Sequence, residues 1–357
     1  MPFTTTISGV QTFLVNTLDE FGVPSDQAEL ISEVVMDSEL RGHWDHGVAY
    51  FLSVVLGSYR NGLNPAPEVR VVQDGPAVTL LDGDGGIGVI GSSQAMDRCI
   101  EKAGTVGIAA AGVVNSVNFI AGAPYVERAA NAGFVAFICS NVPVMSPPTG
   151  GLTKTFGTNP LAYAAPAGNH PPMVIDIATT AIAGSKIMVA RRSGETLDSG
   201  LLMHPDGRDI TDPADFDPVS SLLLPMAGAK GYGLMMMVDV LAGVMTGAQF
   251  GPDLTFGPGG PPSPDNDTTR GGQFMWVIDP AQFMPREEFL SRMDQQMDQI
   301  KAGERMKGVD EIFVPGERGM RHRADLLATG NLQMMDPTWN AMESVANEKG
   351  VPLPDLA

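Results

Sequence analysis

The segment VTLLDGDGGIG (residues 78–88) decides between two fold classes, because its glycines match the GxGxxG pattern of Rossmann dinucleotide-binding domains. It follows a strand-like run and precedes a helical one, as that pattern requires. A Rossmann domain also places an acidic residue about 20 residues further on, at the end of the next strand, to bind the ribose. The corresponding segment, GIAAAGVVNS (residues 107–116), has no carboxylate. We therefore interpret the glycines as a structural turn, and a Rossmann enzyme that uses them as an alternative.

Apolar periodicity on both sides of this turn predicts a mixed α/β protein. Strands and helices do not alternate strictly, so a doubly wound sheet is not expected. Strands are expected within 69–81 and over 107–115, 134–140, 174–177, 272–278 and 311–314. Helices are expected over 7–21, 27–40 (capped by Pro24, Ser25 and Asp26), 48–59, 93–104, 125–132, 185–192, 231–246 and 286–302.

The distribution of these elements suggests three parts. Residues 1–75 form an N-terminal helical segment that packs with the C-terminal part, and residues 76–255 form a central mixed α/β region. Residues 256–357 hold a loop, a strand and helices, and the Gly/Pro-rich stretch 251–272 reads as an irregular surface loop.

Composition narrows the class of partner. The 357-residue chain has a net charge of −19 and no Lys/Arg cluster, which disfavours nucleic acid and anionic membranes. Cys99 and Cys139 are the only cysteines, too few for a disulfide framework, and both lie in apolar runs that predict buried free thiols. We see no signal peptide and no apolar run of the ~20 residues that a membrane helix needs. A cytoplasmic protein with a small-molecule partner is the expectation.

The segment RGHWDHG (residues 41–47) holds two of the five histidines, at a predicted junction between two helices. A structural or catalytic metal needs three or four ligands, and no second cluster supplies them, so no metal is expected. Histidine titrates near neutral pH and suits acid/base work, with Asp45 or the more distant Asp176 to orient it. A capping or solvated histidine stays an alternative.

Two turns are candidate anion sites. Ala229, Lys230 and Gly231 open a predicted helix, where backbone N–H groups can bind a diphosphate. The sequence PGER (residues 315–318) places a cation in a second turn. Each also fits an ordinary tight turn.

Six segments, in order, carry a resemblance: RGHWDHG, NSVNFI (115–120), FGTNP (156–160), IDIATT (175–180), MAGAKGYGL (226–234) and VPGER (314–318). This succession resembles the malate/L-lactate dehydrogenase family of the second type, over roughly residues 5–330. These are NAD(P)-dependent 2-oxoacid reductases unrelated to Rossmann dehydrogenases, with ureidoglycolate dehydrogenase and diketogulonate or imine reductases among them. The resemblance implies a mixed sheet of unusual, non-Rossmann topology with helical N- and C-terminal parts, a homodimer, and NAD or NADP as cofactor in the central region.

The resemblance also implies roles for individual residues. His46 would donate a proton to the substrate carbonyl, with Asp176 beside it and the cofactor. The substrate would lie near Asp45, Tyr50, Asn118 and Thr149. The cofactor would contact Thr158, Asn159, Ile177, Ala178, Thr179, Thr180, Lys230, Gly231, Gly316, Glu317 and Arg318.

Three substrate-side positions depart from the family pattern. The serine before the histidine is Asp45, the arginine four residues after it is Tyr50, and the second motif's histidine is Asn118. Tyrosine cannot supply the charge with which arginine clamps a carboxylate. We therefore expect a ketone, imine or oxoacid with a polar or cationic group beside the reacting carbon, unless Lys154 takes over the carboxylate. A relative that has lost turnover, or only binds cofactor, is the alternative.

Overall fold

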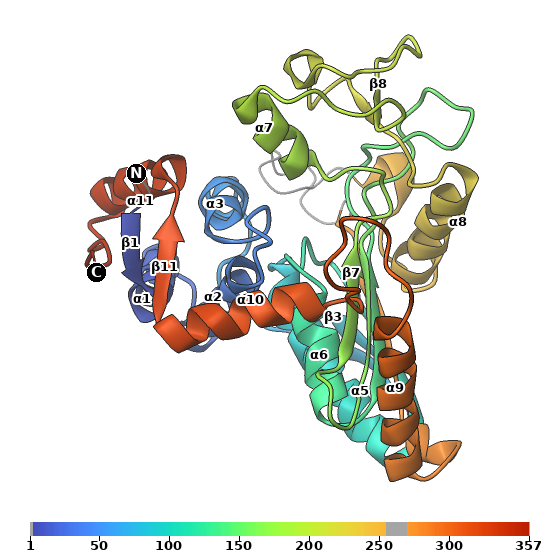
Figure 1. The fold of residues 1–357 in the computed structure, drawn as a ribbon. Helices are drawn as coiled ribbons and strands as arrows, with labels where there is room; N and C mark the ends of the chain where they lie inside the picture. Colours follow the sequence, from blue (N-terminus) through green and yellow to red (C-terminus); the bar gives the residue numbers. More distant parts are fainter. Residues whose placement is uncertain (1–2, 255–269, 357) are drawn as a thin grey trace.

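The computed structural model describes residues 3–254 and 270–356, and its centre is a seven-stranded mixed sheet (Figure 1). The strand order is β2-β3-β4-β10-β5-β6-β7, and only β3 and β4 pair in parallel. A Rossmann sheet is parallel throughout its core, so the predicted non-Rossmann α/β class is confirmed. The strands are β2 (Arg70–Asp74), β3 (Val78–Asp82), β4 (Ile108–Val114), β5 (Val135–Ser140), β6 (Leu161–Ala165), β7 (Met173–Ile177) and β10 (Gln273–Ile278).

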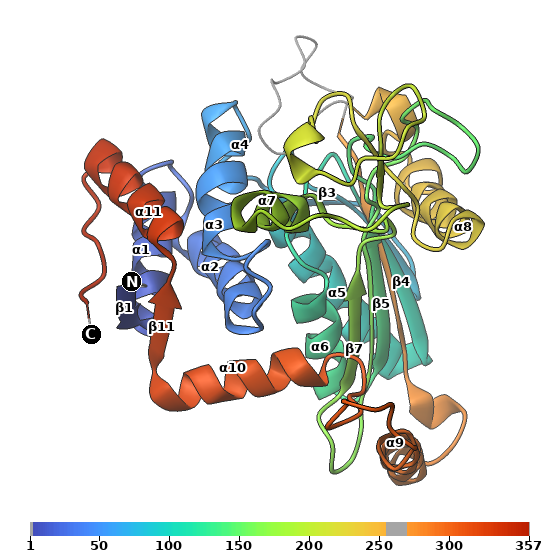
Figure 2. The same cartoon turned by 45° about the horizontal axis from the view of Figure 1, so that its top comes forward.

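Helices cover both faces of this sheet (Figure 2). On one face lie α5 (Gly88–Val106) and α6 (Ala123–Asn131), which pack on β4, β5 and β6. On the other lie α8 (Ala229–Val238), continued by the π-helical segment η3 (Asp239–Val244), and α9 (Arg286–Lys301). Cys99 on α5 and Cys139 on β5 are free and buried, as predicted.

The two ends of the chain meet in a second, mainly helical body (Figure 1). Strand β1 (Phe3–Thr6) pairs antiparallel with β11 (Asn331–Met334), beside α1 (Ile7–Asp19), α2 (Ser25–Leu40) and α11 (Asp336–Lys349). Helix α10 (Glu317–Thr329) connects this body to the sheet. One hydrophobic core runs from α1 and α2 to α5 and the sheet. The three-part division of the chain stays a prediction, and β10, from its last part, lies in the middle of the central sheet.

A continuous helix follows the RGHWDHG segment. It begins as α3 (Val48–Tyr50), widens to the π-helical η1 (Phe51–Val55) and ends as α4 (Leu56–Arg60). Asn61 is its C-cap, and Gly62 continues the chain with φ +88°. The predicted end of this helix is therefore confirmed, and RGHWDHG is indeed the junction between two helices.

The remaining described elements are short. They are α7 (Gly184–Ser193), β8 (Leu202–Met203), β9 (Leu222–Leu223) and the 3-10 turns η2 (Pro213–Asp215), η4 (Gly251–Asp253) and η5 (Pro280–Gln282). Most of the predicted loop 251–272 falls on residues 255–269, outside the described residues. Among the helices of the described ranges, none combines the length and apolar character needed to cross a membrane.

Several predicted boundaries were wrong. Residues 311–314 are not a strand; the segment meets the edge strand β7 just beyond them, where the carbonyl of Pro315 accepts the N–H of Val174 (3.2 Å). Helix α5 starts at Gly88 rather than residue 93, since its first turn is buried and lacks an amphipathic pattern. Helix α2 starts at Ser25 with Pro24 as N-cap and no side-chain cap. The helix predicted over 231–246 starts at Ala229 and turns π-helical after Val238.

Candidate functional site

The RGHWDHG segment is a compact loop held by its own backbone. Helix α2 ends at Arg41, and Gly42 reverses the chain with φ +77°, a conformation that favours glycine. The N–H of His43 donates to the carbonyl of Ser38, and that of His46 donates to the carbonyl of His43, both at 2.9 Å. The loop therefore presents the His46 side chain at a defined place.

The His46 ring is oriented on two sides. Its Nδ1 lies 3.3 Å from the carboxylate of Asp45, and its ring stacks on Tyr50 with centroids 5.0 Å apart. With Nδ1 facing a carboxylate, Nε2 is the nitrogen left for another partner. The side chain is 36% exposed, which suits a residue that must meet a ligand.

Glu39 fixes the end of this loop and was missed by the sequence analysis. Its buried carboxylate accepts the N–H of Val48, the first residue of α3, at 2.8 Å. Burial raises the pKa of Glu39 from 4.5 to about 7, and the Val48 N–H opposes that rise only in part. A Cβ at Gly47 would lie 2.1 Å from the Glu39 carboxylate, which explains the glycine after His46.

Asp176, near the end of β7, lies at the N-terminus of α6. Its Oδ2 accepts the N–H groups of Gly122 (2.9 Å) and Ala123 (2.8 Å), the preferred place for an anion on a helix. Burial raises the pKa of Asp176, while the Ala123 N–H and the charges of His46 and His43 oppose the rise. Asp176 and His46 are thus within electrostatic reach of each other, and their shared role in catalysis stays a prediction. The amide pair was missed, although Gly122, Ala123 and Pro124 form a helix-start pattern.

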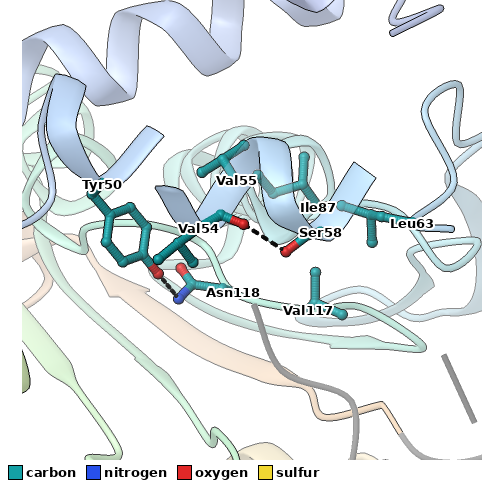
Figure 3. Close-up of a pocket in the computed structure, with 8 residues that line it drawn as sticks. All are labelled: Tyr50, Val54, Val55, Ser58, Leu63, Ile87, Val117 and Asn118. Atoms are coloured by element: carbon teal, nitrogen blue, oxygen red, sulfur yellow. Dashed lines mark hydrogen bonds between the residues drawn. The ribbon is translucent and has the colours of Figure 1, made fainter. Parts of the chain in front are cut away.

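Tyr50 and Asn118, two of the departures from the family pattern, bond to each other. The Asn118 Nδ2 donates to the Tyr50 hydroxyl at 2.5 Å. Burial raises the pKa of Tyr50, the Asn118 hydrogen bond lowers it, and the Asp45 charge raises it further. Tyr50 therefore stays neutral, and this pair supplies no cation. Both residues line a pocket (Figure 3).

Arg41 connects the histidine loop to helix α6. Its side chain is buried and forms ion pairs with Asp37 (2.6 Å) on α2 and with Glu127 on α6. Burial disfavours the charge, but the two carboxylates raise the pKa of Arg41 overall. Arg323 of α10 approaches Asp37 at 3.4 Å. Since α6 also holds Asp176, this cluster sets the loop relative to that carboxylate.

Three of the motifs assigned to the cofactor converge. The N–H and the hydroxyl of Thr179 both donate to the carbonyl of Thr158 (2.9 Å), and the N–H of Met226 donates to the carbonyl of Thr179 (2.9 Å). IDIATT, FGTNP and MAGAKGYGL therefore meet at the end of β7. Ile177 is exposed, Ala178 is half-buried, and the hydroxyl of buried Thr180 donates to the carbonyl of Ile182.

Asn159 is occupied inside the protein. Its buried Nδ2 donates to the carbonyl of Met235 (3.0 Å) and to the carboxylate of Asp239 (2.9 Å). Burial raises the pKa of Asp239 to about 6. The side chain of Asn159 thus joins the FGTNP loop to α8, and any contact with a cofactor would have to come from its backbone.

The start of α8 has the features of an anion site. Gly228 is its N-cap with φ +63°, and no side chain caps the helix. Lys230 is exposed in the first turn. Gly231 is needed for close packing, since a Cβ there would lie 2.3 Å from the Met226 carbonyl oxygen. The N–H of Gly231 donates to the carbonyl of Met226 (2.9 Å), so the helix dipole and the lysine are the features that fit the diphosphate of a dinucleotide.

The VPGER turn docks on the sheet's edge strand β7. Gly316 has φ +87°, and a Cβ there would lie 2.8 Å from the carbonyl oxygen of Val174. The Glu317 carboxylate is bound by Lys301 (2.6 Å) and Arg321 (2.5 Å). Arg318 is exposed. Of the three predicted cofactor residues here, Arg318 is the one whose side chain faces solvent.

Two other predicted residues lie elsewhere. Thr149 is exposed in a turn that follows the paired residue Ser146, and its role with substrate stays a prediction. The Lys154 ammonium donates to the carbonyls of Val219 (2.7 Å) and Pro218 (3.4 Å), so it is engaged at the surface rather than beside His46.

The GDGGIG turn is structural. The N–H of Gly85 donates to the carbonyl of Asn115 (2.8 Å) and that of Gly88 to the carbonyl of Asn118 (3.0 Å). These amides cannot also bind a diphosphate, which argues against the Rossmann alternative. Within the described residues, no three His, Cys, Asp or Glu side chains gather as metal ligands.

Comparison with known proteins identifies the family. Residues 5–343 match the model of the malate/L-lactate dehydrogenase family. The chain belongs to this family. It is 31% identical over 342 residues to the L-sulfolactate dehydrogenase of Methanocaldococcus jannaschii, covering 96% of each chain. The solved structure of a sulfolactate dehydrogenase from that organism matches with a TM-score of 0.87, 30% identity and 98% of both chains covered.

Two further relatives carry a cofactor in their names. The ureidoglycolate dehydrogenase (NAD(+)) of Escherichia coli is 32% identical over 309 residues, covering 85% of this chain and 84% of its own. The (2R)-3-sulfolactate dehydrogenase (NADP(+)) of Chromohalobacter salexigens is 32% identical over 311 residues, covering 87% and 91%. The resemblance found in the six motifs is thus confirmed, and the protein is an oxidoreductase of the dehydrogenase class.

Proposed function

We propose that the protein transfers hydride between a nicotinamide dinucleotide, NAD or NADP, and the reacting carbon of a 2-oxo/2-hydroxy acid or a related ketone or imine, with His46 as proton donor. The observation that carries this proposal is the His46 ring, half-exposed and oriented by Asp45 and Tyr50 within reach of the Asp176 charge. The names of the relatives support the nicotinamide cofactor and the hydroxy-acid class.

The chemistry assigns each side chain a task. A bound nicotinamide supplies the hydride that the carbonyl carbon accepts. Negative charge develops on the carbonyl oxygen, and His46 Nε2 donates the proton that completes the hydroxyl group. Asp45 stabilises the ring's orientation through Nδ1, and the Asp176 carboxyl group lies within electrostatic reach of the ring. In the opposite direction His46 accepts the same proton.

Cofactor binding is proposed along β7 and the start of α8. The backbone around Thr158, Thr179 and Gly231 would line the dinucleotide, with Lys230 at the diphosphate and Arg318 as a second cation. The carboxamide of Asn159 is buried and hydrogen-bonded to Asp239, and Glu317 is held in ion pairs. In this scheme Asn159 and Glu317 are positioning residues. Asp45 places a negative charge at the substrate, which favours a polar or cationic group beside the reacting carbon.

The test compares His46→Gln with His43→Gln, since His43 is exposed in the same loop. Loss of a general acid lowers kcat by about 10²–10⁴-fold. We expect that loss for His46→Gln, with NADH or NADPH binding retained, and a near-normal kcat for His43→Gln. Equal kcat values for the two variants would refute the assignment of His46, and turnover by neither variant nor the parent would favour a non-catalytic relative.

We also propose a homodimer in the reduced cytoplasm. Met236, Met237, Val240, Val244 and Met245 are exposed along α8 and η3, an apolar surface larger than scattered side chains produce. Sedimentation of the protein as a monomer at micromolar concentration would refute the dimer. Free, buried Cys99 and Cys139 are typical of a reducing compartment.

A further inference from the structure

A buried carboxylate outside the histidine loop, that of Asp239, is not used by the chemistry proposed above. Asp239 stands where α8 ends and the π-helical segment η3 begins, and it is 6% exposed. Burial raises its pKa, and two N–H donors oppose the rise: the carboxamide of Asn159 and the backbone of Gly251. A buried carboxylate costs free energy unless such donors bind it. Asp239 therefore joins three segments: the end of α8, the FGTNP loop (156–160) and the turn at Gly251.

The carboxamide of Asn159 is the link between Asp239 and the FGTNP loop. Its Nδ2 donates to the Asp239 carboxylate (2.9 Å) and to the carbonyl of Met235 (3.0 Å), and its Oδ1 accepts the N–H of Val142 (3.3 Å). An amide nitrogen has two hydrogens to donate, so both are used, and both acceptors lie on one turn of the helix. The side chain of Asn159 thus fastens its loop to the C-terminal end of α8.

The same link holds a strained backbone. Asn159 has a φ of +36°, in a region that asparagine enters more readily than most residues do. Such a conformation persists where the surrounding structure fixes it, and here complete burial and the three side-chain hydrogen bonds do so. Without the Asp239 carboxylate, a buried amide hydrogen would lose its acceptor, which is costly. The loop would then be free to relax away from this conformation.

The backbone of the loop contacts the end of β7. The carbonyl of Thr158 accepts both the N–H and the hydroxyl of Thr179 (2.9 Å), and that hydroxyl also donates to the carbonyl of Asn159 (3.3 Å). Just before α8, the N–H of Met226 donates to the carbonyl of Thr179 (2.9 Å). Helix α8, on the face of the sheet opposite α5 (Figure 2), is therefore attached to this region at both of its ends: through Met226 at its start and through Asp239 at its last turn.

We propose that Asp239 is a positioning residue of the nicotinamide site: through Asn159 it holds the FGTNP loop and α8 at the separation that the bound dinucleotide requires. The proposal rests on the function proposed above, which lines the dinucleotide with the backbone around Thr158 and places Lys230, at the start of α8, at its diphosphate. Asp239 itself touches no ligand in this scheme, because it is buried. Its loss therefore weakens cofactor binding, whereas His46 is held by separate contacts in the loop between α2 and α3.

The first experiment titrates the parent and Asp239→Ala with NADH and NADPH and follows nicotinamide fluorescence. We expect the dissociation constant of the preferred nicotinamide to rise about tenfold, because residues that act through others change binding by about that much. Its KM should rise in proportion, with kcat at saturation within about threefold of the parent's. A dissociation constant within about twofold of the parent's, or a loss confined to kcat, would overturn the inference.

Asp294→Ala is the matched control for lost stability. Asp294 is a second carboxylate of low exposure on a helix (9%), and it accepts the N–H groups of Gly168 (3.0 Å) and Asn169 (2.8 Å). These belong to the loop between β6 and β7, at the other end of β7 from Thr179. We expect this variant to unfold at a lower temperature than the parent and to bind the nicotinamide normally. An equal loss of affinity in both variants would overturn the inference.

A double-mutant cycle tests the route through Asn159. Asn159→Gly removes the carboxamide and tolerates the positive φ. If Asp239 acts through Asn159, adding Asp239→Ala to Asn159→Gly should weaken nicotinamide binding no further, whereas independent effects would multiply and overturn the inference. Should Asp239→Ala fail to fold, Asn159→Gly carries the test, because it breaks the same hydrogen bond from the other side. Normal affinity in Asn159→Gly would overturn the inference.

Nicotinamide binding by the parent separates this inference from the proposed function. A parent that binds NADH or NADPH, with the same affinity in Asp239→Ala, refutes the positioning role alone. A parent that binds neither dinucleotide refutes the proposed function and the inference with it.

Discussion

Replacing Glu39 by glutamine should change how stability depends on pH. The folded protein raises the pKa of this carboxyl group from 4.5 to about 7, chiefly because it is buried behind Gly47. The folded state therefore holds the proton more tightly than the unfolded state does. Since each pKa unit corresponds to about 1.4 kcal/mol, this group contributes about 3 kcal/mol below pH 4.5 and loses that contribution as the pH rises to about 7.

Glutamine cannot ionise, yet its Oε1 can still accept the N–H of Val48. We expect the unfolding free energy of Glu39→Gln, relative to that of the parent, to rise by about 3 kcal/mol between pH 4.5 and pH 8. Urea unfolding at several pH values measures this difference. Glu33→Gln, at an exposed position of the same helix, is the control and should track the parent. Parallel pH profiles for Glu39→Gln and the parent would refute the reasoning.

Two further substitutions test the packing of the histidine loop. In Gly47→Ala the new methyl group displaces the Glu39 carboxylate, 2.1 Å away, and should destabilise the protein by about 1–3 kcal/mol. Its thermal unfolding temperature measures this, and an unchanged value would show that Glu39 moves freely. In Arg41→Met the carboxylates of Asp37 and Glu127 lose their main cation, which should lower the unfolding free energy by about 3–5 kcal/mol in urea. A loss below about 1 kcal/mol would mean that the cluster is solvated like a surface pair.

Much of the fold could be predicted because its signals are local. Helices such as α1 and α9 show their periodicity within one window, and Asn61 and Gly62 mark a helix end directly. Strand β6 escaped notice because LAYAA is small, nearly all buried and set among Gly, Pro and Thr. Strands β1 and β11 are short, and they pair only through the meeting of the chain's two ends.

The candidate site divides in the same way. The motif could be recognised in the sequence because Asp45, His46 and Gly47 are consecutive. The bond between Tyr50 and Asn118 joins residues 68 positions apart, and no sequence spacing reports such a contact. Glu39 is the last residue but one of α2, where a glutamate is ordinarily solvated, and only the return of the chain at Gly47 buries it. The motif assigned Asn159 to the cofactor, whereas its side chain donates a hydrogen bond to the carbonyl of Met235 on α8.

The claim that this protein is a nicotinamide-dependent oxidoreductase is tested most directly by titration of the purified chain with NADH and NADPH, followed by nicotinamide fluorescence. We predict saturable, micromolar binding of at least one of them, weakened in Lys230→Met, because that lysine is exposed at the uncapped start of α8. Binding of neither dinucleotide would contradict the account and would remove His46 from any catalytic role.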